Sequence, residues 1–210
     1  MNFILLLDYA HLDEPVFLKS LSQSLGELRG QKGIILHADS SYTDRIIQTG
    51  VLSDVARRRS MKDLNNRLVA LLADNGVAAV GLNGYQRNII HKTQDGDWQI
   101  DQNYLLSFPD GVNLVLSCLV SEEHQEDPQP ASLSVIGQQI AAKLNISRII
   151  TFTRQDAEEV FSSDDSDLPF NTLETNLSEE VLKSHLPEEL TNLPSGCIVT
   201  STRKLETALK

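Results

Sequence analysis

The stretch GIILHADSSYTD, residues 33–44, decides the fold. It has the pattern of an apolar strand, a turn and the beginning of a helix. In α/β proteins this junction often binds phosphate, on glycine-rich turns whose backbone N–H groups come close to the anion. Here the turn is His37-Ala38-Asp39-Ser40, with no glycine and one carboxylate. The element order thus favours an anion site, whereas the residues of the turn oppose one.

Similar strand and helix patterns alternate on both sides of this stretch. Continuous apolar runs predict buried strands at 3–8, 32–37, 77–82, 112–120, 148–153 and 196–201. Helical spacing and end signals predict helices at 12–30, 41–50, 60–76, 132–145, 176–186 and from 202 onward. Repeated strand–helix units imply a mostly parallel sheet with helices on both faces, which is a three-layer α/β/α sandwich.

Three local signals refine this prediction. Asp13 is expected to cap the helix at 12–30, which Gly30 ends. In the helix at 60–76, helical spacing predicts an apolar stripe of Met61, Leu64, Leu68, Leu71 and Leu72 that faces the core. Two short runs flank Asp95-Gly96, so residues 88–101 are expected to form a hairpin that projects from the sheet.

Composition limits the classes of partner. The net charge of -11 argues against nucleic acid, because phosphate backbones favour clustered Lys and Arg. No apolar stretch reaches the roughly 18 residues that a membrane span needs, and the start lacks a basic leader, so no membrane contact and a cytoplasmic location are expected. Cys118 and Cys197 lie in apolar runs and are expected to be buried free thiols, without the spacing of a zinc site.

Three segments carry a resemblance to a known family. They are NNRLVALLADNGVAAVGLNG (65–84), GDWQIDQNYLLSFPDGVNLVLSCLV (96–120) and IGQQIAAKLNISRIITFT (136–153). Their element order and short matches resemble the amino acid kinase superfamily, and specifically acetylglutamate kinase. The resemblance implies the carbamate kinase-like fold in a single domain at 1–210, with a substrate-side lobe at 1–131 and a nucleotide-side lobe at 132–210. The second lobe is expected to be reduced and truncated at its C-terminal end.

The resemblance also implies an activity. The family moves the γ-phosphoryl group of ATP, with Mg²⁺, onto the side-chain carboxylate of N-acetyl-L-glutamate in arginine biosynthesis. Lysines, glycine-rich turns and an aspartate position and neutralise the migrating group, because this chemistry is mainly positioning and charge stabilisation.

Most of the family's phosphoryl-transfer residues have no counterpart here. Leu7-Asp8-Tyr9-Ala10 stands where the family has Lys-x-Gly-Gly, and His37-Ala38-Asp39-Ser40 stands for His-Gly-Gly-Gly. Residues 130–134 replace an Asn-x-Asn-Ala-Asp motif, and the final lysine maps to Thr200 or, with an insertion, to Lys204. Asp39 would repel a γ-phosphate, as would Asp8 if its side chain faces the site. Lys204 is therefore the single candidate catalytic residue.

Four residues are candidates for binding a substrate-like ligand. Asn66 matches a position in the helix that the family uses near its substrate, and His37, Asp39 and Ser40 form the turn after the second strand. A purely structural role is the alternative for two of them. Asn66 would then be an exposed polar residue in a helix, and His37 a residue at the end of a strand.

These observations lead to a main hypothesis and three alternatives. The main one is a non-catalytic binding or regulatory protein, expected as a homodimer, that binds a small acyl amino acid or a protein partner, without cofactor or metal. The resemblance implies that a dimer would pair through roughly 60–76. A divergent but active acetylglutamate kinase would use ATP and Mg²⁺, with substitute cations such as Lys92, Arg87 or Lys204. The third is a purely structural subunit. The fourth is a divalent-metal hydrolase, with its metal ligands drawn from His11, Asp13, His37 and Asp39.

Overall fold

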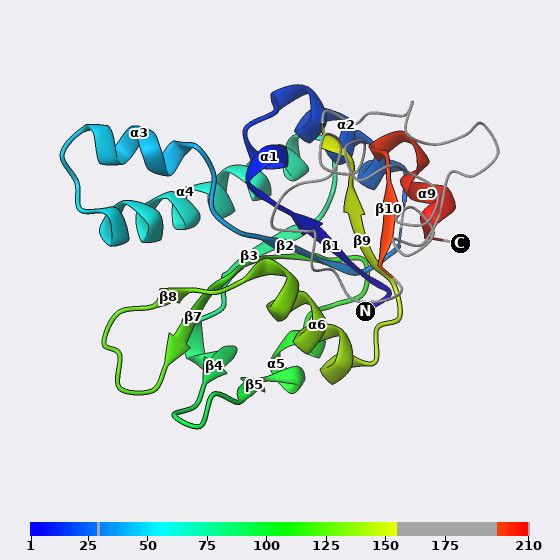
Figure 1. The fold of residues 1–210 in the computed structure, drawn as a ribbon. Coiled ribbons are helices and arrows are strands. Elements are labelled where there is room, and N and C mark those ends of the chain that lie inside the picture. Colours follow the sequence, from blue (N-terminus) through cyan, green and yellow to red (C-terminus); the bar gives the residue numbers. More distant parts are fainter. Residues whose placement is uncertain (29, 155–196, 210) are drawn as a thin grey trace, which may run out of the picture.

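A computed structural model describes residues 1–28, 30–154 and 197–209. Its main sheet has six strands in the order β10-β9-β1-β2-β6-β3, and every neighbouring pair is parallel (Figure 1). The strands are β1 (Phe3–Leu7), β2 (Gly33–His37), β3 (Ala79–Asn83), β6 (Asn113–Ser117), β9 (Ile149–Phe152) and β10 (Ile198–Thr200). The helix predicted at 176–186 lies outside the described residues.

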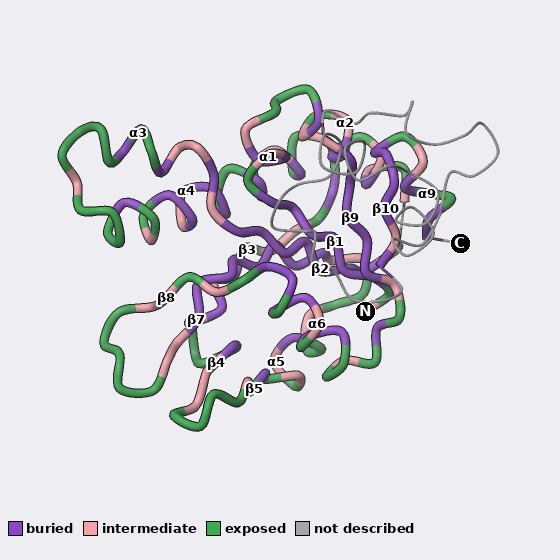
Figure 2. The backbone as a smooth tube through the Cα atoms, viewed as in Figure 1, coloured by how far each residue is buried: buried purple, intermediate pink, exposed green. Residues whose placement is uncertain are grey.

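Both faces of this sheet are covered, which explains the continuous apolar runs. In β1, Phe3, Leu5 and Leu7 face one layer, and Ile4 and Leu6 face the other, because side chains alternate along a strand. The first layer contains α2 (Pro15–Glu27), α4 (Ser53–Asp74) and α9 (Leu205–Ala208). The second contains α6 (Leu133–Leu144) and a smaller sheet. Figure 2 shows the central strands as mainly buried, so the three-layer α/β/α prediction is confirmed.

The smaller sheet contains the predicted hairpin. Its order is β5 (Trp98–Ile100), β4 (Ile90–Lys92), β7 (Leu119–Glu122) and β8 (Gln129–Pro130). β4 and β5 are antiparallel, and the turn between them contains Gly96 at φ 88°, a conformation that favours glycine. η1 (Gln86–Asn88) precedes this hairpin, and α5 (Gln102–Leu106) follows it.

Two of the predicted elements are divided in the structure. The helix expected at 12–30 is instead α1 (Tyr9–Leu12) followed by α2, and the N-cap of α2 is Glu14, without a side-chain hydrogen bond. The capping role predicted for Asp13 is therefore wrong. The run at 112–120 forms β6 and β7 in different sheets, with Cys118 between them. The Cys118 N–H still donates to the carbonyl of His37, in β2, at 2.9 Å, whereas from Leu119 onward the chain pairs with β8 and β4 in the smaller sheet.

The predicted helices at 41–50 and 60–76 correspond to α3 (Tyr42–Gln48) and to α4, which begins earlier, at Ser53. Met61, Leu64, Leu68 and Leu72 are buried, as the apolar stripe predicts, but Leu71 is only half-buried. The chain ends through η4 (Thr202–Lys204) and α9. Cys118 and Cys197 are free and buried, as expected.

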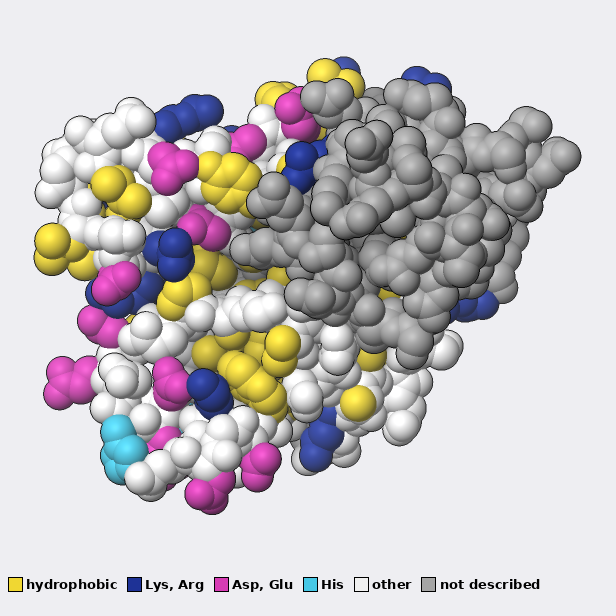
Figure 3. All heavy atoms as spheres, in the orientation of Figure 1, with side chains coloured by type: hydrophobic (Ala, Val, Ile, Leu, Met, Phe, Trp, Pro, Cys, Tyr) yellow, Lys and Arg dark blue, Asp and Glu magenta, His cyan; other side chains and the backbone are white. Residues whose placement is uncertain are grey.

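One face of the molecule is mixed in charge. Figure 3 shows acidic and basic side chains interspersed with apolar ones, without a continuous basic area among the coloured atoms. Within the described chain, no helix combines the length and the apolar character that a membrane crossing needs.

Candidate functional site

A cavity of about 340 Å³ lies where the chain leaves the carboxyl end of β2. We call it the strand-end cavity. Ligands of parallel α/β sheets commonly bind at this edge. Its lining residues come from α1, the turn after β2, α3, α4, β8 and the segment after β8: Tyr9, Ala38, Asp39, Thr43, Asp44, Ile47, Arg57, Met61, Pro130, Ala131 and Ser132. Arg58 of α4 also binds Asp127 at 3.0 Å, which ties α4 to the loop that leads into β8.

Asp39 is the central charged group of this cavity. Its Oδ1 accepts hydrogen bonds from the Ser40 N–H at 2.8 Å and from the Thr43 hydroxyl. Its Oδ2 accepts one from Arg57 Nε at 3.0 Å, and the Asp39 and Arg57 side chains are 22% and 45% exposed. The carboxylate thus occupies donors that a bound anion would otherwise use.

Ser40 and Asp13 stabilise the same turn from the other side. Ser40 is buried, and its hydroxyl accepts a hydrogen bond from the Tyr42 N–H at 3.3 Å. Asp13 Oδ2 accepts one from the Ser41 N–H at 2.5 Å. Ser40 does not line the cavity, so its contribution in the structure is to the shape of the turn.

His37 is buried and fixed in a neutral form. Nδ1 lies 2.9 Å from the carbonyl oxygen of Ala38, and Nε2 lies 3.1 Å from Asn65 Nδ2. The first partner only accepts and the second donates, so the proton is on Nδ1 and Nε2 is an acceptor. Burial lowers the pKa of His37 to about 4. Its ring therefore joins β2 to α4, and both ring nitrogens are engaged.

Asn65, which precedes the candidate Asn66, is the asparagine that points inward. Besides His37 Nε2, the carbonyl oxygens of Leu82 and Val115 each lie 3.0 Å from its Nδ2, so the two N–H groups of the amide are shared among three acceptors. Asn66 is exposed and does not line the cavity. The inward position of Asn65 could have been predicted from the sequence. Asn65 follows Met61 by four residues and precedes Leu68 by three, which places it on the apolar face of α4.

A second buried histidine lies beside the carboxyl end of β1. Asp8 caps α1 and accepts a hydrogen bond from the Ala10 N–H at 2.9 Å, so its carboxylate is directed to the helix and does not line the cavity. His11 Nε2 donates to the Phe152 carbonyl at 2.9 Å, and the ring stacks on Phe17 at 4.7 Å. Burial lowers the pKa of His11 to about 4.

Tyr9 and Asp44 form the outer wall of the cavity. The Tyr9 hydroxyl donates to Asp44 Oδ2 at 2.8 Å, and this bond is the main reason that the pKa of Tyr9 rises to about 12. Among the described residues, no group of three or more His, Cys, Asp or Glu side chains is placed to hold a metal ion.

The structure places Lys204 apart from the other candidates. It ends η4, which packs against α2 through contacts that include a 2.5 Å hydrogen bond between the Ser20 and Thr202 hydroxyls. Lys204 does not line the strand-end cavity. Of the predicted site residues, the structure brings His37, Asp39 and Ser40 together in one turn, with Asn66 and Lys204 outside it.

Comparison with known proteins shows the fold. No model of a protein family and no curated protein sequence matches the chain. Aspartate kinase from Synechocystis matches over 73% of this chain and 28% of its own, at 13% identity and a TM-score of 0.58. Isopentenyl phosphate kinase from T. acidophilum matches over 98% and 93%, at 11% identity and a TM-score of 0.58.

N-acetylglutamate synthase from Neisseria gonorrhoeae, solved with coenzyme A and N-acetyl-glutamate, matches over 95% of this chain and 59% of its own, at 14% identity and a TM-score of 0.58. The chain thus spans under a third of the aspartate kinase and about three fifths of the synthase. These proteins belong to the amino acid kinase superfamily, and the α/β fold of this chain matches theirs.

The Asn65 contacts generate a stability prediction. Asn65→Leu keeps the branched shape and the number of side-chain heavy atoms but leaves His37 Nε2 and two carbonyls without this donor, so the free energy of unfolding should fall by about 3 kcal/mol. Urea denaturation measures this loss. The matched control, Asn66→Leu at the exposed neighbour, should change it by less than about 0.5 kcal/mol. Equal losses in both variants would contradict the assigned orientation of α4.

The buried histidines generate a pH prediction. The pKa values of His11 and His37 lie near 4 in the folded protein, below the ordinary value of 6.5, so the unfolded chain binds more protons between these limits. Stability from these groups is complete above about pH 6.5 and falls toward pH 4, by at most about 1.4 kcal/mol per pH unit for each histidine. Urea denaturation at several pH values measures this slope.

Two variants test whether the buried histidines cause this pH dependence of stability. His37→Gln should remove about half of it. His124→Gln, at an exposed position, should leave it unchanged. Stability that stays constant between about pH 6.5 and pH 4 would contradict burial of the two neutral rings.

Proposed function

We propose that this chain is a non-catalytic protein of the amino acid kinase fold that binds a small ligand in the strand-end cavity and does not transfer phosphate. One observation carries the proposal: the Asp39 carboxylate takes hydrogen bonds from the Ser40 N–H, the Thr43 hydroxyl and Arg57. These are the kinds of donor that a phosphoryl group would need at this turn.

The charge of the cavity supports the same proposal. Among its lining residues, Arg57 is the single cation, and it is paired with Asp39. Asp44 adds a second carboxylate to the wall. Phosphoryl transfer requires cations around the migrating group, and like charges in a partly dehydrated cavity repel strongly. A γ-phosphate would therefore meet a lining with a net negative charge.

An acylated amino acid is the ligand class that we propose. Arg57 binds Asp39 through Nε, so the other N–H groups of its guanidinium, in a side chain that is 45% exposed, can bind one ligand carboxylate, a smaller demand than that of a γ-phosphate. Ile47, Met61 and Ala131 offer apolar contacts for an acyl group. The synthase with this fold was solved with N-acetyl-glutamate, which makes that compound the first probe.

A divergent, active acetylglutamate kinase is the alternative. Several proteins with this fold are kinases by name, including aspartate kinase and isopentenyl phosphate kinase. None of the substitute cations lines the strand-end cavity: Lys92 pairs with Glu122 at 3.0 Å, Arg87 lies over the Tyr104 ring, and Lys204 lies in η4. Turnover would require one of these groups to move to the strand-end cavity.

Thermal unfolding with and without ligands tests the proposal. MgATP should not shift the midpoint, whereas N-acetyl-L-glutamate at about 100 times its Kd should raise it by roughly 5 °C or more. Arg57→Gln should abolish that rise, and Arg59→Gln, an exposed change on the same helix that pairs with Asp63 outside the cavity, should retain it. ADP formation that depends on N-acetylglutamate would refute the proposal in favour of the kinase.

The proposal includes a homodimer in the cytoplasm. Among the described strands β3 pairs with β6 alone, so its other edge is open for a symmetric contact. Free buried thiols suit a reducing compartment. Sedimentation at micromolar concentration should give about twice the 23.3 kDa of one chain, and a 23.3 kDa species would remove the dimer.

A further inference from the structure

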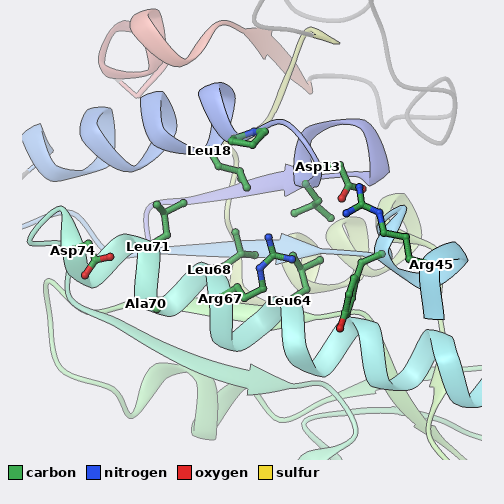
Figure 4. Close-up of a pocket in the computed structure, with 12 residues that line it drawn as sticks. Asp13, Leu18, Arg45, Leu64, Arg67, Leu68, Ala70, Leu71 and Asp74 are labelled. Carbon is green, nitrogen blue, oxygen red and sulfur yellow. The ribbon is translucent and has the colours of Figure 1, made fainter. Parts of the chain in front are cut away.

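A second cavity, of about 490 Å³, lies between α2 and α4. We call it the interhelical cavity. Figure 4 shows its residues between the two helices, with Asp13 and Arg45 at one end and Asp74 at the other. Its lining residues are Leu12, Asp13, Pro15, Leu18, Tyr42, Arg45, Leu64, Arg67, Leu68, Ala70, Leu71 and Asp74. None of them lines the strand-end cavity, so the two are separate spaces.

Five of the twelve residues that line this cavity are leucines. Leu64 and Leu68 belong to the core and are almost fully buried, so they provide a dry apolar base. Leu18 and Leu71 continue this surface but are only half-buried. Leu71 is the one residue of the predicted apolar stripe of α4 that is only half-buried, because it lines this cavity. A volume of this size is in the range of small-molecule sites, roughly 300–1,000 Å³.

The arginines of this cavity differ from the other arginines of α4. Arg57, Arg58 and Arg59 each pair with an aspartate. Arg67 and Arg45 are exposed, and their side chains make no ion pair or hydrogen bond with any described residue. Figure 4 shows the Arg67 side chain rising from α4 among the leucines of the cavity. In a chain with a net charge of -11, two unpaired guanidinium groups beside an apolar surface are a specific feature.

We propose that the interhelical cavity binds a small monocarboxylate with a linear hydrocarbon chain. The carboxylate binds Arg67 and Arg45, since guanidinium groups match the geometry of a carboxylate, and the hydrocarbon lies along the leucines. An alkylamine of the same length would meet the same apolar wall, but its ammonium group would lie beside two repelling guanidinium groups, while Asp13 at that end already accepts the Ser41 N–H. The lining includes two aspartates, which disfavour a more highly charged anion such as phosphate.

Isothermal titration with a chain-length series tests this site. Octanoate should bind at one site per chain, and affinity should rise by roughly three- to fourfold for each methylene from butyrate to octanoate. Octylamine should bind at least tenfold more weakly than octanoate. No heat with octanoate at millimolar concentration, or equal affinity for octylamine, would overturn the proposal.

Charge-matched variants locate the binding. Arg67→Gln and Arg45→Gln should each weaken octanoate binding by at least tenfold, and Leu71→Ser should reduce the gain per methylene. Lys19→Gln, the same loss of charge on the exposed side of α2, should have no effect because Lys19 does not line the cavity. Arg57→Gln should also have no effect, which separates this site from the proposed acyl amino acid site. Unchanged affinity in both the Arg67 and Arg45 variants would overturn the assignment.

Sedimentation of the same variants tests whether a second copy of the chain, and not a small ligand, covers this cavity. Leu71→Ser should leave the sedimentation coefficient unchanged, because the apolar wall serves a ligand. Dissociation of a dimer by Leu71→Ser, with no octanoate binding by the wild type, would overturn the proposal and assign the cavity to the subunit interface.

Discussion

The arrangement of the whole site depends on the amide of Asn65. Its Nδ2 reaches the ring of His37 at the end of β2, a carbonyl of β3 and a carbonyl of β6. A helix that is bound to three strands by one buried group has a fixed rotation about its axis. The backbone supports this contact, because a Cβ at Gly81 would lie only 2.3 Å from Asn65 Oδ1. That rotation directs Arg57 and Met61 to one cavity and Arg67 to the other.

The charged groups at the end of β2 are satisfied within the protein. Asp39 accepts hydrogen bonds in its own turn and pairs with Arg57, while Asp13 accepts the N–H of Ser41. A carboxylate that belongs to the chain is held at a fixed position and is not lost by dilution, unlike a bound phosphate. The turn therefore keeps its shape without glycine and without a ligand.

The sequence predicts the layers of this fold well, because continuous apolar runs such as 3–8 and 32–37 indicate strands that are covered on both faces. The hairpin was also predictable, since Asp95-Gly96 is a local turn signal. The break between α1 and α2 was not, because Asp13 is engaged by Ser41, which is distant in sequence. The inward position of Asn65 depends likewise on carbonyls of β3 and β6, so only the helical spacing of its neighbours indicated it.

The short helix α3 is a common wall of the two cavities. Thr43, Asp44 and Ile47 face the strand-end cavity, and Tyr42 and Arg45 face the interhelical one. With only seven residues, α3 has little packing of its own to absorb a displacement on either side. If a ligand in one cavity moves this helix, it changes the free energy of binding in the other cavity. By thermodynamic linkage the effect is equal in both directions. Binding of one ligand would then change the affinity for a chemically different ligand, through α3 alone.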